Sequence, residues 1–437
     1  MMTEKKMTTK NHVDVFYYPN CSTHSFCLSL YVKAGCIYES EHDNGITHFL
    51  EHLIFRGVND RMQGKMYERL DQLGLCFNGA TYKEFMHLYM IGAPQHFEEA
   101  AELFLHVFAP FTLPASQVET EQQRVKAEIR EAEERKTLDY FAGEFVWADT
   151  PVKNTILGNR GNVSRFNRSR MEVYRKTVFQ SENIFFYVTG NVGETDIKGL
   201  ARRIESCSID IGTLGRKNAV EIPEGFCCRP LKVHLKNSPY TMVQFSFDVK
   251  TQRYTGAELA LLYDILFSGE SSLIHQELSE KRGWIYSYTS ALEKYTNIGR
   301  LYFTYEIGRQ NLKDSIELVL QCLSTLTNQD ELNRRLLCVL PEYTDNTYMI
   351  YDDNEGFNWQ RAYECHMMNS PASSVEDTRS AYEAVKAERL RDIAREIFRP
   401  ENLVLSLKGK KRQIEISEIE TVIAGWRPCG DKAPRRI

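Results

Sequence analysis

Apolar residues along this chain follow two different periods, which alternate with each other. Period-two alternation, typical of a strand with one buried face, is clearest at Leu28-Leu30-Val32 and at Val243-Phe245-Phe247. Helical periodicity lies between such strands, in residues 97–109, 116–138, 255–268 and 313–327. Strands interleaved with helices on one side predict an α+β fold.

The pattern of the first half returns in the second half. Residues 179–190 and 398–409 share a Phe, a Glu-Asn pair, an apolar strand and a closing Gly, at an offset of 219. Residues 24–35 are echoed by residues 240–251 at an offset of 216. Two matches at nearly one offset predict a diverged internal repeat, although any two β-strands share some of this pattern.

The length of the chain favours two domains. A chain of 437 residues is too long for one ordinary hydrophobic core. Glycines, a proline and polar residues gather in residues 209–229, which we interpret as a linker. We predict an N-terminal domain over residues 1–208 that carries the candidate chemistry, and a related C-terminal domain over residues 230–437.

Composition narrows the class of protein. Charged residues make up 26% of the chain and hydrophobic residues 42%, as in soluble globular proteins. The net charge of -5 gives no reason to expect nucleic acid as a partner, and no apolar run reaches the length of a membrane helix. The eleven cysteines are scattered without a C-x-x-C pair, and the N-terminal residues do not read as a secretory signal. We therefore expect reduced cysteines and a cytoplasmic protein.

The most informative motif is H-x-x-E-H at residues 48–52. On a helix, His48 and His52 project from one face with Glu51 beside them, so two imidazoles can bind one zinc ion while the carboxylate reaches its water. Zinc hydrolases of this kind use three protein ligands and keep a fourth position open. The motif predicts one Zn2+ per chain and requires a third ligand.

Glu128 is the candidate for that third ligand. It lies 76 residues after His52 in the helix predicted at residues 116–138, and Glu121 precedes it by two helical turns on the same face. Glu128 would complete the metal site, and Glu121 would support the ligands from behind. The alternative is an ordinary solvated helix, because this stretch is rich in Glu, Lys and Arg.

This pattern resembles the inverzincin peptidases, the pitrilysin and insulinase-like family. It is most similar to the half-length subgroup that includes mitochondrial processing peptidase and bacterial zinc peptidases. Residues 34–57 frame the motif as in that family, and Asn78 and Thr81 match its strand beside the zinc, with Gly79 where an alanine is usual. Residues 273–290 resemble the family's second-domain signature, so the resemblance covers nearly the whole chain.

The resemblance implies a fold and a mechanism. Each domain would have a largely antiparallel sheet with helices packed on one side, and the pair would form half of a clam-like chamber. Glu51 would take the proton of the attacking water and pass it to the leaving amine. An extended peptide would add to a sheet edge along a strand from Phe77 to Tyr89, with a bulge or hairpin turn as the alternative. The predicted substrate contacts are Phe77, Asn78, Gly79 and Ala80.

One position departs from the family pattern. The family's second domain supplies an arginine and a tyrosine seven residues apart, which reach the substrate across the chamber. Tyr286 is in place as the catalytic tyrosine, but Ser279 stands at the arginine position, and a hydroxyl cannot replace a bidentate cation. Arg282 should point elsewhere. We therefore expect a heterodimer with a related chain that supplies the arginine–tyrosine pair, and a homodimer is the competing prediction.

The predicted function is that of a zinc metalloendopeptidase acting on peptides or unfolded segments. Its task would be maturation of a ribosomally made precursor peptide, or general oligopeptide turnover. Two alternatives are a non-catalytic scaffold subunit, which in this family typically loses zinc ligands, and a peptide-binding module that uses the same sheet edge without cleavage. Metal content and a Glu51→Gln variant distinguish these alternatives from the enzyme.

Overall fold

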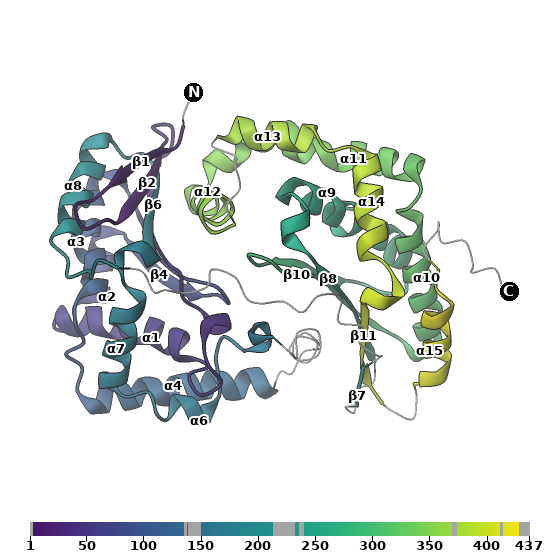
Figure 1. Cartoon of the computed structure of the whole chain (residues 1–437), viewed down its shortest axis with the longest axis horizontal. Helices are drawn as coiled ribbons and strands as arrows, with labels where there is room; N and C mark the ends of the chain where they lie inside the picture. The colour runs from purple at the N-terminus through teal and green to yellow at the C-terminus, as the bar shows by residue number, and fades with distance from the viewer. Residues whose placement is uncertain are drawn as a thin grey trace. The chain divides into compact units, whose positions relative to one another are not determined.

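The chain divides into two compact units, each with its own sheet and hydrophobic core (Figure 1). The structure is a computed structural model. It describes residues 3–134, 138, 150–212, 232–235, 240–368, 374–410 and 414–427. The first unit comprises residues 1–135, 151–220 and 348–374, and the second comprises residues 136–150, 221–347 and 375–437. Residues 213–229 of the predicted linker lie outside the described residues, so the predicted domain boundaries stay a prediction.

The first unit contains a six-stranded sheet in the order β1-β2-β6-β3-β5-β4. Only β2 and β6 run parallel, and all other neighbours are antiparallel. The strands are β1 (Lys5–Thr8), β2 (Asp14–Pro19), β3 (Phe26–Val32), β4 (Cys76–Thr81), β5 (Met86–Gly92) and β6 (Ile184–Gly190). The helices are α1 (Ile46–Arg61), α2 (Met66–Leu73), α3 (Phe97–Phe104), α4 (Ala115–Glu134), α6 (Arg160–Val163), α7 (Arg168–Val178), α8 (Glu194–Glu205) and α12 (Asn354–Arg361).

The second unit contains a five-stranded sheet in the order β7-β11-β8-β10-β9. Only β7 and β11 run parallel. The strands are β7 (Lys232–Leu235), β8 (Thr241–Val249), β9 (Tyr288–Lys294), β10 (Gly299–Ile307) and β11 (Leu403–Gly409). The helices are α9 (Gly256–Phe267), α10 (Leu312–Thr325), α11 (Gln329–Thr344), α13 (Val375–Glu383), α14 (Ala387–Ile397) and α15 (Ile416–Gly425). The predicted fold class, α+β with two largely antiparallel sheets, is therefore confirmed.

The two sheets share one topology, which supports the predicted repeat. From β2 and from β7 onward, the strands stand in the same order and have the same single parallel pair. Ile184 begins β6 and Leu403 begins β11, at the predicted offset of 219. The second predicted match is one residue out of register, because Val32 pairs with Ile184 while Phe247 pairs with Leu403. The buried positions give the correct register, because Leu28 corresponds to Val243 and Val32 to Phe247, and a slip of one residue would exchange the two faces of the strand.

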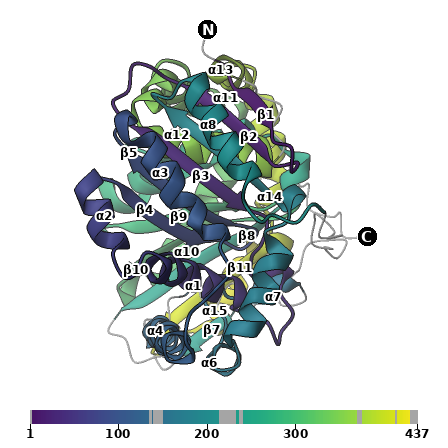
Figure 2. The same ribbon diagram turned by 90° about the vertical axis from the view of Figure 1, so that its left-hand side faces the viewer.

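The core of the first unit lies between the sheet and its helices. Leu28, Leu30 and Val32 are fully buried in it, as their period-two pattern predicts. Figure 2 looks onto this helical layer, in which α3 and α8 cross the sheet. The four helical stretches predicted from periodicity correspond to α3 with the 3-10 turn after it, α4, α9 and α10. Their ends differ by one or two residues, except at the end of the stretch 116–138, where residues 135–137 lie outside the described residues.

The opposite face of the first sheet is also covered. Helix α12 comes from the second half of the sequence, yet it packs on β3 and β6 on the side away from α3 and α8 (Figure 1). Asn358 on α12 donates hydrogen bonds to the backbone oxygens of Cys27 (3.2 Å) and Tyr187 (3.0 Å). The resemblance implied helices on one side of each sheet, so α12 adds a covered face that the sequence did not predict.

The single strand predicted from Phe77 to Tyr89 is wrong. The chain makes β4, turns at Tyr82, whose N–H donates to the Phe85 carbonyl (2.8 Å), and returns as β5. Lys83 fixes this turn by donating from its ammonium group to the backbone oxygens of Val152 and Asn154. These partners are distant in sequence, so local periodicity could not reveal the turn. Strand β4 stands at the edge of the sheet.

Candidate metal centre

A buried carboxylate fixes the start of helix α1. Glu39 accepts hydrogen bonds from the backbone N–H groups of Gly45 (2.7 Å) and Thr47 (2.9 Å) and from the Thr47 hydroxyl (2.6 Å). It thereby satisfies free N–H groups of the first turn and places a negative charge at the positive end of the helix. Gly45 has φ 97°, and a Cβ there would lie 2.8 Å from the carbonyl oxygen of Leu157. The position of His48, in this first turn, is therefore set by the surrounding fold.

His48 and His52 lie one turn apart on α1, and both face Glu128 on α4. The Glu128 Oε2 atom is 3.7 Å from His48 Nε2 and 3.6 Å from His52 Nε2. Ligand atoms 2.0–2.1 Å from a tetrahedral zinc ion stand about 3.4 Å apart, so these side chains fit around an ion of that size. Two imidazoles and one carboxylate are also the donors of a hydrolytic zinc site. Among the described residues, no other three His, Cys, Asp or Glu side chains meet in this way.

Glu121 lies behind this ligand cluster. Its side chain is 1% exposed, and its Oε2 atom is 3.3 Å from His52 Nδ1. Its other oxygen accepts a hydrogen bond from Arg56 Nε (2.8 Å) and a second one from Arg56 Nη2. This carboxylate engages the Nδ1 atom of His52 and leaves the Nε2 atom facing Glu128, the arrangement in which outer partners orient metal-binding imidazoles.

The electrostatics of the cluster favour a positive charge at its centre. Burial lowers the pKa of His52, but hydrogen bonds with Glu121 and Glu128 outweigh burial and raise the pKa to about 9. Burial, with the charge of His52 next in size, lowers the pKa of His48 to about 4. The hydrogen bond with His52 lowers the pKa of Glu128. The carboxylates of Glu121 and Glu128 therefore favour positive charge at the His52 imidazole.

Glu51 lies beside the ligands without joining them. Its Oε2 atom accepts a hydrogen bond of 2.5 Å from the hydroxyl of Thr81, the last residue of β4. Burial raises the pKa of Glu51. The carboxylate is thus held between the ligand helix and the edge strand, and burial makes it a better proton acceptor than an exposed glutamate.

The predicted substrate residues Phe77, Asn78, Gly79 and Ala80 all lie in edge strand β4. The ring of Phe77 packs toward the helices, with its centroid 4.7 Å from that of Phe55. Phe55, Phe77 and Tyr67 line a cavity of about 390 Å³ that also touches Glu51 and His52. The edge strand and an aromatic cavity therefore adjoin the ligand cluster.

The predicted second-domain residues belong to the other unit. Tyr286 is 96% exposed, and Ser279 lies in a π-helical turn, His275–Glu280. Arg282 donates to the backbone oxygen (3.0 Å) and the carboxylate (2.8 Å) of Glu277, so its guanidinium is already engaged. The catalytic role of Tyr286 stays a prediction.

No sequence pattern predicts the roles of Glu39, Arg56 and Thr81. Glu39 and Thr81 lie in stretches that carry the family resemblance, which assigns them no task. Arg56 stands four residues after His52, on the same helix face, and that spacing was the available signal. Nothing local indicated that Glu121 would be its partner.

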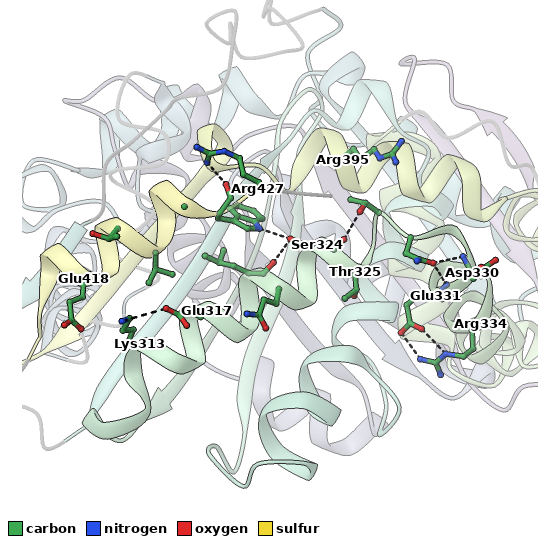
Figure 3. A pocket seen from close by; sticks show the side chains of 18 residues that line it. Lys313, Glu317, Ser324, Thr325, Asp330, Glu331, Arg334, Arg395, Glu418 and Arg427 are labelled. Atoms are coloured by element: carbon green, nitrogen blue, oxygen red, sulfur yellow. Dashed lines mark hydrogen bonds and ion pairs between the residues drawn. The ribbon is translucent and has the colours of Figure 1, made fainter. Parts of the chain in front are cut away.

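A larger cavity, of about 1390 Å³, lies in the second unit between α10, α11, α14 and α15. Figure 3 shows that its charged lining residues include two that pair with each other, Glu331 and Arg334 (2.8 Å). Trp426 on its wall donates to the Ser324 hydroxyl (2.9 Å). Size does not make this cavity the reactive site, because its walls hold no ligand cluster of the kind found in the first unit.

Comparisons with known proteins agree with this geometry. Residues 15–160 match the sequence model described as "Insulinase (Peptidase family M16)", and residues 165–335 match the one described as "Peptidase M16 inactive domain". A protein of Bacillus subtilis (strain 168), "Uncharacterized zinc protease YmxG", is 22% identical over 397 residues, which are 90% of this chain and 95% of that protein.

Two further proteins extend the comparison. The beta subunit of the mitochondrial-processing peptidase of Bos taurus is 27% identical over 178 residues, 40% of this chain and 36% of that protein. The crystal structure of the periplasmic protease PqqL from Escherichia coli has a TM-score of 0.78 at 15% identity. This alignment covers all of the present chain and 51% of PqqL, so the present chain has the fold of half of that protein.

Proposed function

The chain belongs to the insulinase-like M16 peptidase family, and on that premise we propose that it is a zinc-dependent endopeptidase acting on peptides or unfolded segments. The observation that carries this proposal is the convergence of His48, His52 and Glu128, with Glu51 beside them and a free sheet edge next to Glu51.

Several residues of the chain have separate roles in the proposed peptide hydrolysis. When bound, zinc lowers the pKa of a bound water toward ~7 and polarises the substrate carbonyl. Glu51 accepts the proton of the attacking water and then delivers it to the leaving amine, while the Thr81 hydroxyl keeps its carboxylate in place. Glu121 and Arg56 keep the His52 imidazole oriented.

Backbone recognition suits the proposed substrate class. An edge strand offers unpaired N–H and C=O groups to any extended peptide, so strand β4 would bind unfolded segments with limited regard to sequence. Cleavage of an unstructured peptide library, followed by mass spectrometry, tests this. Cleavage that stops on chelation and returns with added zinc supports the proposal, and zinc-loaded protein that is isolated with its bound partner chains and cleaves no peptide contradicts it.

We further propose that the chain works as the zinc subunit of a heterodimer, and three observations support this. Ser279 stands where the family places an arginine. PqqL has about twice the length of this chain, and the related mitochondrial protein is named as a subunit. Native mass spectrometry of the protein isolated from its own cells should find one copy paired with a related chain of similar size. A homodimer with full activity would overturn this part of the proposal.

Two narrower proposals follow from the same reasoning. We propose maturation of a ribosomally made precursor peptide as the task, which predicts cleavage at one bond of that precursor, whereas cleavage at many bonds would indicate general peptide turnover. We also propose a cytoplasmic location. All eight cysteines that the structure describes are free of disulfide bonds. None of the described helices is long and apolar enough to cross a membrane.

A further inference from the structure

The cavity beside the ligand cluster has a cationic side chain at its entrance. This cavity, of about 390 Å³, lies between α1, α2, α4 and edge strand β4, and its walls include the rings of Phe55, Tyr67 and Phe77. Arg124 on α4 also lines the cavity, and its side chain is 60% exposed. A cavity of this volume is at the small end of the range for ligand sites. One side chain of a bound peptide is therefore the ligand that fits its size.

The protein itself engages the guanidinium of Arg124 only weakly. One oxygen of Glu121 accepts two hydrogen bonds from Arg56, and the other oxygen lies 3.3 Å from His52 Nδ1. Among the described residues, Glu121 is also the one ion-pair partner of Arg124, whose Nη1 atom lies 3.4 Å from both carboxylate oxygens. This distance is longer than most N–H···O hydrogen bonds. One carboxylate thus serves two guanidinium groups, and most donors of Arg124 stay available to a second anion.

A second donor lies in the same wall. Asn59 lines the cavity, and its side-chain oxygen accepts a hydrogen bond of 3.2 Å from the backbone N–H of Met66. This contact leaves the amide NH2 group of Asn59 as its donor for a ligand. The cavity therefore combines aromatic walls with a guanidinium and an amide donor. Such walls suit the methylene groups of a short side chain, and such donors suit a carboxylate at its end.

A peptide on the edge strand can direct side chains into this cavity. Phe77 and Thr81 of β4 face the helices, where they contact Phe55 and Glu51. Because side chains alternate along a strand, every second side chain of a peptide paired with the free edge of β4 is directed to the same face. The cavity lies on that face, since Phe77 lines it together with residues of α1, α2 and α4.

We propose that Arg124 is a specificity-determining residue that binds an aspartate or glutamate side chain of the peptide on β4. This inference rests on the proposed function for the position of the peptide, and it narrows the substrate class. The cavity also touches Glu51 and His52, so the selected acidic residue lies within about two residues of the cleaved bond. An internal segment of a substrate has no free terminus there, so a side chain supplies the carboxylate.

The test is peptide binding to zinc-loaded protein that is isolated with its bound partner chains and carries Glu51→Gln in every variant to stop cleavage. The probes are dye-labelled, unstructured peptides with amidated C-termini that differ only in the position of one glutamate, with a glutamine parent. Fluorescence anisotropy gives each Kd. At the selected position, glutamate should bind roughly tenfold more tightly than glutamine. Arg124→Gln should remove that advantage, and Arg124→Glu should transfer it to lysine at the same position.

The matched control is Arg130→Gln, which removes the same charge from an exposed residue of α4 outside the cavity lining. This variant should keep the preference for glutamate. The readout is the ratio of two Kd values on one protein, so a variant that only disturbs the metal site through Glu121 weakens both peptides alike and keeps the ratio. The inference is overturned if no glutamate position gains affinity, or if the gain survives Arg124→Gln.

Two further measurements separate the source of the carboxylate and the two proposals. Peptides of graded length without glutamate, each ending in a free carboxylate, test the C-terminus as the ligand, and a gain confined to this series overturns the side-chain inference. Cleavage by the wild-type protein with its partner chains tests the proposed function. Selective binding without cleavage would leave the acidic subsite standing and remove the peptidase, whereas cleavage without a preference for glutamate would do the reverse.

Discussion

Each unit packs a corresponding pair of helices against its own sheet, yet among the residues that the structure describes only the first unit brings three possible metal ligands together. In the first unit, α1 and α4 bring together His48, His52 and Glu128. In the second, the corresponding helices α9 and α11 are joined by a hydrogen bond of 2.5 Å from the Tyr343 hydroxyl to Asp264. The Asp264 carboxyl group has a neutral partner, and burial raises its pKa, so this pair is satisfied without an ion.

The contact between the helix and the edge strand also differs between the two units, with a carboxylate in the first and only hydroxyl groups in the second. Glu51 on α1 accepts from Thr81 on β4, whereas Tyr263 on α9 bonds to Ser290 on β9 through two hydroxyl groups 2.8 Å apart. The fold therefore supplies a helix beside a free strand in both units, and the side chains decide whether that place carries a base. The family model that matches residues 165–335, most of which lie in the second unit, is described with the word "inactive", which agrees with this difference.

Substitutions that remove the helix–strand contact of each unit should give the largest difference, measured as kcat. Glu51→Gln should lower kcat by about 10³-fold while zinc content stays unchanged, because the amide cannot accept the proton. Tyr263→Phe removes the corresponding contact in the second unit and should leave kcat within about twofold, because it lies outside the reacting groups. Steady-state cleavage of one labelled peptide measures both, and an equal loss in the two variants would end the distinction between the units.

The second comparison uses two carboxylates, Glu121 and Asp264, each of which joins the two helices of its pair. Glu121→Gln should weaken zinc binding roughly 10- to 100-fold, because His52 loses its charged partner. Asp264→Asn should leave zinc affinity unchanged. Competition with a zinc-selective dye measures both, and unchanged affinity in Glu121→Gln would show that this carboxylate does not support the ligands.

The edge strands differ at a glycine. Gly79 and Ser290 occupy corresponding places, opposite Leu88 and Phe303 in their sheets. A Cβ at Gly79 would lie 2.7 Å from the Leu88 side chain and 3.0 Å from the Phe55 ring, so this place in the strand has little room for a larger residue. Gly79→Ala should cost about 1–3 kcal/mol of stability through overpacking.

The matched control for this substitution should change the stability in the opposite direction. Gly199 lies in helix α8, and a Cβ added there would meet no atom within 4 Å, so Gly199→Ala should stabilise the protein by about 0.5–1 kcal/mol. Denaturant unfolding measures both variants, and a stabilised Gly79→Ala protein would contradict the packing account.

The smallest expected effect concerns the segment that covers the first sheet. Glu4 accepts hydrogen bonds from Tyr187 of β6 (2.5 Å) and from His366 (3.1 Å), so it connects the π-helical turn Ala362–Met367 after α12 to the first sheet. Burial raises the pKa of Glu4, but these bonds outweigh it and the pKa falls below its ordinary 4.5. A lowered folded pKa contributes stability above about pH 4.5 that is lost as pH falls below that value.

Glu4→Gln should therefore destabilise the protein by about 1–2 kcal/mol at pH 7, and the difference from wild type should shrink as the pH falls below 4.5. Thermal unfolding across this range measures the effect. A difference that stays constant with pH would show that the charge of Glu4 contributes nothing.

Elements and site residues that follow local or periodic sequence patterns could be predicted, whereas contacts between residues distant in the sequence could not. Period-two alternation located β3 and β8, and helical spacing brought His48, His52, Glu121 and Glu128 to facing sides of two helices. The turn at Tyr82 depends on Lys83 reaching backbone oxygens near residue 153, and no local pattern records that contact. Helix α12 lies in an aromatic stretch whose composition indicates burial but not which sheet face it covers.

The measurement that tests the central claim most directly is the zinc content of the purified chain, by elemental mass spectrometry, compared with a His48→Ala/His52→Ala double variant that remains folded by circular dichroism. The account predicts one zinc ion per wild-type chain and essentially none in the variant, with cleavage of an unstructured peptide lost in parallel. Equal zinc content in both proteins, or cleavage that survives the loss of zinc, would contradict it.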